Sequence, residues 1–324
     1  MSRARAAKYL VYTLVLGCIA YFFYRAFQRN WHSIRAHDFV FDYVALGFSV
    51  VALLATYLFA TYGWHRSINA LSDSGQLSLA QSMAAVNSSN LTKYLPGKVW
   101  SYALQLFWLS RAGFSKSLVT YINVINLGVS VITTLIAGLM LLLFSPRTLP
   151  TTTSLALLAL AIAADLLAMK YHAPLLRWGI ALLNRLFKRD LKYFEPPARV
   201  WLELHVFHLL GAFAFGLTAY LTSLGIGYAL PLRDAPLVMA ALLIADLVGF
   251  AAIFVPGGLG VREGFMYVLL GGTQAGSLAL TLPLAVRMLN MLVDLALGGL
   301  ALHLSRGFGG NKPNAGTPSQ EIVT

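Results

Sequence analysis

The sequence has 324 residues, of which 58% are hydrophobic and only 11% are charged; its mean hydropathy is +0.70 and its formal net charge is +12. This composition excludes an ordinary soluble enzyme, whose water-exposed surface needs more charged residues. Because the apolar residues come in blocks long enough to cross roughly 30 Å of hydrocarbon, we expect an all-α, polytopic transmembrane helical bundle.

Six segments with few or no charged residues are predicted to cross the membrane completely. In chain order they are 9–24, 43–63, 118–144, 154–169, 204–224 and 278–304. The first resembles a lipoprotein leader as far as Cys18, but its apolar run continues to Tyr24, so we expect an uncleaved anchor. Cys18 is the one cysteine of the chain, which rules out an intrachain disulfide.

Two further apolar stretches, 77–108 and 237–270, are each interrupted by a Pro-Gly pair, at Pro96 and at Pro256. Proline removes a backbone donor and clashes with the preceding turn, while glycine lets the chain reverse direction. We therefore expect two re-entrant hairpins that enter and leave the membrane on one side. If each hairpin is counted as a transmembrane segment, the total is eight.

The distribution of basic residues predicts the orientation. The loop 170–199 has seven Lys or Arg residues against two acidic ones, so the positive-inside rule places it in the cytoplasm. With both termini cytoplasmic, 17 of the 24 Lys and Arg residues lie inside and five outside. These cations lie next to spans, where anionic lipid headgroups attract them. We expect an inner-membrane protein of a bacterium that contacts membrane lipids and no nucleic acid.

An internal repeat is predicted from matched spacings. The two Pro-Gly pairs are 160 residues apart, and the spans that begin at Leu118 and Leu278 have the same offset. Each half therefore consists of two spans, a broken hairpin and a third span. The first half starts inside and the second outside, which is the inverted repeat typical of transporters. The expected division is 1–150, 151–306 and a disordered tail, 307–324.

The two breaks indicate a polar site inside the bundle. Freed backbone groups in hydrocarbon cost several kcal/mol, so such breaks persist only where they line a wet or protein-covered cavity. Half-helix N-termini also favour an anionic group such as a phosphate. The candidate substrate-binding residues at the hairpins are Asn87, Asn90, Lys93, Pro96, Gly97, Lys98, Asp246, Pro256, Gly257, Gly258, Gly260, Arg262 and Glu263.

Three more candidates, Arg287, Asn290 and Asp294, share one stripe of the last span, and Asp246 is the expected partner of Arg287. Asn123, Asn126 and Ser130 form a similar stripe in the first half. Simpler alternatives remain open. The two lysines near Pro96 can extend to the headgroups, Arg262 and Glu263 can form a local ion pair, and both stripes can serve only to hold helices together.

Other chemistry finds little support. Glu203, His205 and His208 resemble a metal cluster, but the two histidines, at i and i+3, have no third ligand at a recognisable spacing. The sequence contains no nucleotide-binding glycine loop, no G-x-S-x-G elbow and no H-E-x-x-H motif. We therefore expect no metal, no cofactor and no assigned catalytic residue, and we favour a protein that is not an enzyme.

Two motifs carry a resemblance to a known family. Asn87-x-x-Asn90 leads into the segment 95–100, Leu-Pro-Gly-Lys-Val-Trp, and 255–263 has the sequence Val-Pro-Gly-Gly-Leu-Gly-Val-x-Glu. With these motifs the chain resembles the lysylphosphatidylglycerol synthase transmembrane-region family. The resemblance implies a flippase-like membrane unit, here without the cytosolic aminoacyl-transferase domain. Many relatives have Gly-Glu where this chain has Trp100-Ser101, so the headgroup preference can differ.

From these observations we expect a protein that binds, and translocates between leaflets, an anionic or polyprenyl-linked lipid. Two alternatives stay open. One is a membrane-embedded lipid or glycolipid transferase that uses Asp246 or Glu263 as a base. The other is a non-transporting accessory protein that works with a partner in an envelope-lipid or polysaccharide pathway. Sequence predicts neither the lipid nor the oligomeric state.

Overall fold

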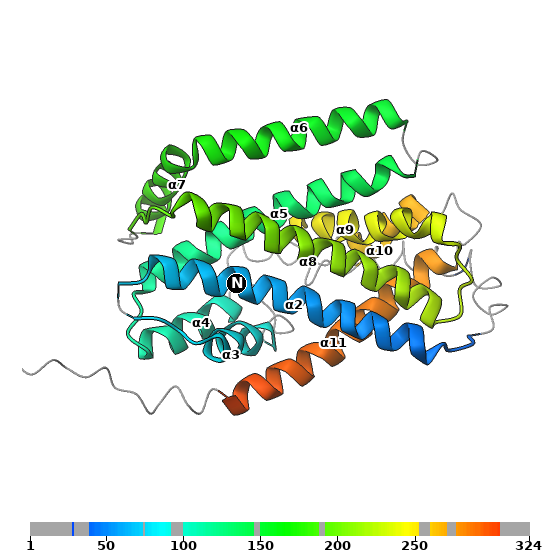
Figure 1. Ribbon diagram of the computed structural model, residues 1–324, viewed down its shortest axis with the longest axis horizontal. Helices are drawn as coiled ribbons and strands as arrows, with labels where there is room; N and C mark the ends of the chain where they lie inside the picture. The colour runs from blue at the N-terminus through cyan, green and yellow to red at the C-terminus, as the bar shows by residue number, and fades with distance from the viewer. Residues whose placement is uncertain are drawn as a thin grey trace, which may run out of the picture.

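The computed structural model describes residues 28, 39–73, 75–91, 100–145, 150–187, 192–252, 260–270 and 277–304. Within these ranges every regular element is a helix (Figure 1). The helices are α2 (Tyr43–Leu71), α3 (Leu79–Asn90), α4 (Trp100–Arg111), α5 (Lys116–Leu143), α6 (Thr151–Lys170), α7 (His172–Phe187), α8 (Ala198–Gly225), η2 (Leu232–Asp234), α9 (Ala235–Ala251), α10 (Val261–Leu270) and α11 (Leu278–Leu304).

Six stretches of helix are long and apolar enough to cross a membrane: α2, α5, α6, α8, the run Leu232–Ala251 that ends α9, and α11 as far as Ala301. The predicted polytopic helical bundle is therefore confirmed, and the protein is a multi-pass membrane protein. Five of the six expected spans appear among these helices. The expected first span, 9–24, and the expected tail, 307–324, lie outside the described residues.

Two expectations about length need correction. The second interrupted stretch contains α9, and the run Leu232–Ala251 has 20 residues, so it is long and apolar enough to cross the bilayer. By contrast, α3, α4 and α10 have 12, 12 and 10 residues, too few at 1.5 Å per residue. The expected loop 170–199 also contains a helix, α7. Pro96, Gly97, Pro256 and Gly257, the expected turn residues, lie outside the described residues.

Local chemistry sets where several helices begin. The Asp42 carboxylate accepts hydrogen bonds from the first N–H groups of α2, at 2.9 Å from Val44 N. Ser78 and Gln81 form a capping box at the start of α3. Ser115 caps α5 in the same way, by accepting from the Leu118 N–H. Because these caps satisfy N–H groups that have no partner within the helix, each helix starts at a defined residue.

Helices α2 and α8 lie side by side and antiparallel through the middle of the bundle (Figure 1). At one end the Asp42 N–H donates to the Gly225 carbonyl at 3.1 Å. Near the other end Arg66 of α2 forms an ion pair of 2.8 Å with Glu203 of α8. These two helices are the matching spans of the two predicted halves. Their antiparallel packing is the arrangement that an inverted repeat requires.

Packing between the halves follows the same pattern. α5 of the first half packs on α9 of the second, and α11 of the second half packs on α3 of the first. Each contact has a glycine: a Cβ at Gly138 would lie 2.9 Å from Ile244 Cγ1, and one at Gly298 would overlap the Leu91 side chain. Gly138 and Gly298 are themselves 160 residues apart. The boundary near residue 150 stays a prediction.

The two ends of the bundle differ in charge. We call one of them the basic end; among the described residues it comprises Arg66, Arg111, Lys116, Lys170, Arg177, Arg185, Lys192 and Arg199. The α3–α4 hairpin starts and finishes there, since Leu77, just before α3, exchanges hydrogen bonds with Asn69 of α2. The α9–α10 hairpin starts and finishes at the opposite end, where Arg233 is the one described cation. The hairpins thus enter from opposite ends (Figure 1).

Candidate functional site

The first turn of α10 places two ion pairs inside the bundle. Arg262 Nη1 lies 2.9 Å from Asp246 Oδ1 of α9, and Arg287 Nη1 of α11 lies 3.0 Å from Glu263 Oε1. The Glu263 side chain is only 2% exposed, whereas that of Asp246 is 44% exposed. The Glu263 carboxylate is therefore deeply buried, although its partner Arg287 is 30% exposed, and the Asp246 carboxylate remains accessible.

Glu263 is held by a second contact that also shapes the helix. Its Oε2 accepts a hydrogen bond of 2.8 Å from the Gly260 N–H, which closes the first turn of α10. Gly260 has a φ of 81°, a conformation that favours glycine. Both carboxylate oxygens of Glu263 are thus occupied, as a buried charge requires. Glu263 and Gly260 fix the geometry of the turn that presents the next cation.

Arg262 has donors to spare. Its guanidinium lies over the Phe215 ring of α8, with the carbon 5.9 Å from the ring centroid. Nη1 binds Asp246, but Nε and Nη2 are buried and have no hydrogen-bond partner in the part of the chain that the structure describes. Buried donors without partners are costly. An anion with several acceptor oxygens, such as a phosphate or a carboxylate, matches this fork geometry.

Close packing brings Arg262 to this position. A Cβ at Gly249 of α9 would lie only 3.1 Å from Arg262 Cβ. The absence of a side chain at Gly249 therefore lets α10 approach α9 closely enough for the Asp246 pair to form. Gly249 and Phe215 carry no charge and lie in apolar runs, so sequence reasoning missed both.

The expected pairing of Asp246 with Arg287 is wrong. Arg262 and Glu263 are consecutive, and successive residues of a helix point about 100° apart. Arg262 therefore faces α9 and pairs with Asp246, whereas Glu263 faces α11 and pairs with Arg287. The same geometry explains why Arg262 and Glu263 form no ion pair with each other.

The polar stripe of α11 serves several helices. Asp294 is 1% exposed and accepts a hydrogen bond of 2.6 Å from the Tyr57 hydroxyl of α2. Asn290 donates to the Val286 carbonyl of its own helix at 2.9 Å. The stripe thus connects α11 to α10 through Arg287 and to α2 through Asp294. Tyr57 is a further residue that gave no signal in the sequence, because it lies inside an apolar span.

At the first hairpin the described site residues are neutral. Asn87 is 3% exposed, and its amide nitrogen donates to the Met83 carbonyl at 3.0 Å. Gln105 of α4 donates to the Ser89 hydroxyl of α3 at 2.9 Å, which joins the two arms. Asn90 is half-buried at the end of α3. The other first-hairpin candidates, Lys93, Pro96, Gly97 and Lys98, and the second-hairpin candidates Pro256, Gly257 and Gly258, lie outside the described residues.

The asparagine stripe of α5 holds helices together. Trp64 Nε1 of α2 donates to Asn123 Oδ1 at 3.3 Å. His208 of α8 contacts Asn126 Oδ1 at 3.2 Å through its Nε2. The interhelical alternative therefore describes Asn123 and Asn126, which reach α2 and α8 and not a shared cavity with α11.

The acidic and histidine cluster on α8 is also part of the packing. Glu203 binds Arg66 and, at 2.8 Å, Arg199. His205 Nε2 lies 3.1 Å from Asp165 of α6. Among the described residues, no group of three or more His, Cys, Asp or Glu is arranged to hold a metal ion. These contacts attach α6 and α2 to α8.

The site thus contains Arg262, a cation with two buried nitrogens that lack partners among the described residues, together with acidic residues. It lies at the start of a helix within a membrane bundle. No curated protein matches the sequence. The family model described as the lysylphosphatidylglycerol synthase TM region matches residues 7–298. Since this match covers most of the 324 residues, the protein belongs to the lysylphosphatidylglycerol synthase transmembrane-region family.

Proposed function

We propose that the protein binds an anionic or polyprenyl-linked lipid through its phosphate and translocates it between leaflets. The observation that carries this proposal is Arg262, whose Nε and Nη2 are buried at the start of α10 and have no hydrogen-bond partner among the described residues. A phosphate supplies acceptor oxygens for both nitrogens at once, and such charge-assisted bonds are the strongest in proteins. The acyl or prenyl chains stay in the bilayer.

The neighbouring residues have separate tasks in this mechanism. Glu263 and Arg287 stay paired and hold the first turn of α10, because both Glu263 oxygens are occupied. Asp246 is half-exposed and bound to Arg262 through one nitrogen. An incoming phosphate therefore competes with Asp246 for the guanidinium, and the freed carboxylate turns towards water. When the lipid leaves, Asp246 binds Arg262 again.

The antiparallel halves support movement across the membrane. The α3–α4 and α9–α10 hairpins enter from opposite ends, so a site between them can be reached from either leaflet in turn. The basic end faces the cytoplasm of an inner membrane in this proposal, since cations near spans are retained on that side. Membrane lipids are then the partners at both ends.

The direct test is lipid scrambling in proteoliposomes that contain a fluorescent anionic phospholipid. Arg262→Ala is expected to lower the rate about tenfold or more, because hydrogen bonds to charged groups are worth about 1.5–3 kcal/mol. Arg233→Ala, which removes an exposed cation just before α9, at the end of the bundle opposite the basic end, is the matched control and is expected to keep the wild-type rate. If Arg262→Ala scrambles as fast as wild type, the phosphate site is wrongly assigned.

A second measurement separates movement from chemistry. Mass spectrometry of the lipid after the assay is expected to show unchanged molecules. Covalent alteration of the added lipid would replace translocation with the transferase alternative. If the wild-type protein moves no lipid but retains a stable partner protein through purification, the accessory role would replace it instead.

A further inference from the structure

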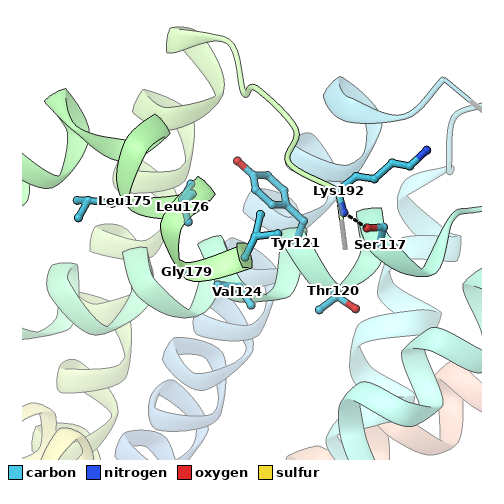
Figure 2. A pocket seen from close by; sticks show the side chains of 9 residues that line it. Ser117, Thr120, Tyr121, Val124, Leu175, Leu176, Gly179 and Lys192 are labelled. Carbon is cyan, nitrogen blue, oxygen red and sulfur yellow. Dashed lines mark hydrogen bonds between the residues drawn. The ribbon is translucent and has the colours of Figure 1, made fainter. Parts of the chain in front are cut away.

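A hollow lies at the basic end between α7 and the first turns of α5 (Figure 2). We call it the α5–α7 groove. Its floor and walls are Leu175, Leu176, Gly179 and Ile180 of α7 with Tyr121 and Val124 of α5. Except for the rim, where Ser117, Thr120 and Lys192 lie, the lining is apolar. The groove is separate from Arg262, which lies on the hairpin that enters from the opposite end.

α7 has the character of a helix that lies along a membrane surface. One of its stripes is apolar and exposed, although these side chains would be buried in a soluble domain. The stripe consists of Leu175, Trp178, Leu182 and Leu186, at spacings of three, four and four residues. Arg177 lies on the opposite side of the same helix, and Arg185 lies at the edge of the stripe, two turns after Trp178. A helix of this kind lies with its apolar face in the headgroup boundary of the bilayer.

The rim of the groove is positive. Lys192 is exposed, and its backbone N–H bonds the Ser117 hydroxyl of α5, which fixes the segment beside the groove. Figure 2 shows the Lys192 side chain directed outward from α5. Lys116 starts α5, whose N-terminus adds a partial positive charge. Lys192 is the one charged residue among the described residues that line the groove, and the Glu195 carboxylate lies near Tyr121 and Tyr193 outside this lining. An anionic headgroup thus matches the rim, and a hydrocarbon chain matches the interior.

Tyr121 adds an independent indication of a ligand. The residue is 4% exposed and lines the groove, yet its hydroxyl has no hydrogen-bond partner within the described residues. Buried tyrosine hydroxyls normally bind an acceptor. Its neighbour Tyr193 packs edge-on at 5.9 Å. Burial, followed by the nearby Glu195 carboxylate, raises the pKa of Tyr193, so that ring also stays neutral. A glycerol ester oxygen is the kind of acceptor that Tyr121 lacks.

We propose that the α5–α7 groove holds one anionic phospholipid as a resident ligand. One acyl chain lies between Gly179 and Val124, an ester oxygen accepts from the Tyr121 hydroxyl, and the phosphate lies near Lys192 and Lys116. The lipid stays bound while others are moved, and it fastens α7 to α5. This site is independent of the proposed translocation through Arg262.

The glycine in the groove permits a selective test. A Cβ at Gly179 meets nothing within 4 Å, so Gly179→Leu introduces a bulky side chain into the groove from a position with open space around its Cβ. Leucine also favours a helix over glycine by up to about 1 kcal/mol, so folding is preserved. Gly128→Leu is the matched control, because Gly128 lies on α5, is exposed and has equally open space around it. Val124→Phe blocks the groove from the other wall.

The measurement uses the full chain in nanodiscs that contain phosphatidylglycerol with a photoreactive group in one acyl chain, followed by mass spectrometry of the labelled peptides. We expect labels on α7 and on the start of α5 in wild type and in Gly128→Leu. Gly179→Leu and Val124→Phe should each lower these labels at least severalfold. Tyr121→Phe should lower them to a smaller extent.

Headgroup choice is tested with the same label on phosphatidylcholine. We expect weaker labelling of the groove than with phosphatidylglycerol, and Lys192→Gln should reduce the difference. Equal labelling by both lipids would overturn the anionic assignment. Labels that persist in Gly179→Leu and Val124→Phe would show that no lipid chain enters the groove. A crosslink from the groove to another segment of the same chain would show that the protein itself covers it.

Discussion

The two broken hairpins have equivalent places in the two halves but differ in chemistry. At three positions of the second hairpin the chain has charged residues where the first has uncharged ones 160 residues earlier: Asp246, Arg262 and Glu263 correspond to Val86, Tyr102 and Ala103. The packing is nevertheless alike, since α9 lies on α5 as α3 lies on α11. The first hairpin therefore packs in this way without such charges. We infer that the charges of the second hairpin serve a task that the first does not share.

The largest expected effect on stability comes from substituting Glu263. This substitution distinguishes the second hairpin from the first most clearly. Glu263→Ala removes the buried carboxylate that binds Arg287 and accepts from the Gly260 N–H. We expect a loss of about 3 kcal/mol of stability, the lower end of the cost of breaking a buried ion pair, because the Arg287 side chain is 30% exposed. Thermal unfolding in detergent measures it. Ala103→Ser, at the matching place, should change stability by less than about 0.5 kcal/mol; equal losses would contradict the comparison.

The second largest effect on stability is expected at the two glycines where the halves contact each other. The two substitutions should cause similar losses. Gly298→Ala places a methyl group on the Leu91 side chain, and Gly138→Ala places one 2.9 Å from Ile244 Cγ1. Each is expected to destabilise the fold by about 1–3 kcal/mol through overpacking. Gly299→Ala meets nothing within 4 Å and serves as the control in the same unfolding measurement. If only one of the two glycines matters, the equivalence of the two contacts is wrong.

A smaller effect on stability is expected at Gly249. A methyl group there lies 3.1 Å from Arg262 Cβ, so α10 must shift by a few tenths of an ångström. Gly249→Ala should cost about 1 kcal/mol of stability and slow proteoliposome scrambling severalfold, because the guanidinium moves relative to Asp246. Scrambling at the wild-type rate, with the stability loss present, would show that the position of Arg262 is unimportant for transport.

The smallest effect is expected at Asn87 of the first hairpin. Its amide nitrogen bonds only its own helix, and its amide oxygen has no partner among the described residues. Asn87→Ala should therefore change stability by no more than about 1 kcal/mol and should leave scrambling nearly unchanged. A transport loss as large as that of Arg262→Ala would mean that both hairpins bind the lipid.

Membrane class, spans and candidate charges could be predicted from the sequence because each depends on local composition. Arg262 and Glu263 were predicted as site residues because a charged side chain inside an apolar stretch is costly unless it has a partner or a function. Their partners could not be found, because the choice between α9 and α11 depends on how α10 is rotated. Phe215 and Gly249 are uncharged and belong to the site only because the fold brings them close to Arg262. The sequence therefore gives no signal for them.

The helix α7 could have been predicted from the sequence, but the segment was interpreted as a loop. The positive charge of the segment predicts a cytoplasmic loop, whereas the spacing of Leu175, Trp178, Leu182 and Leu186 predicts a helix. This spacing is helical, and the apolar stripe it forms is typical of a surface-lying helix. The basic charge indicates on which side of the membrane the segment lies, and the apolar periodicity indicates that it is a helix. Both indications apply to α7.

The antiparallel contact of α2 and α8 limits how the two halves can move. Asp42 bonds Gly225 near one end, Ser49 contacts Thr222 at 2.7 Å further along, and Arg66 binds Glu203 near the other. A slide by one helical turn, about 5.4 Å, would break all of these contacts together. A tilt about the middle of the crossing strains mainly the outermost ones. We therefore expect any motion between the halves to pivot around this pair of helices, without sliding along their axes.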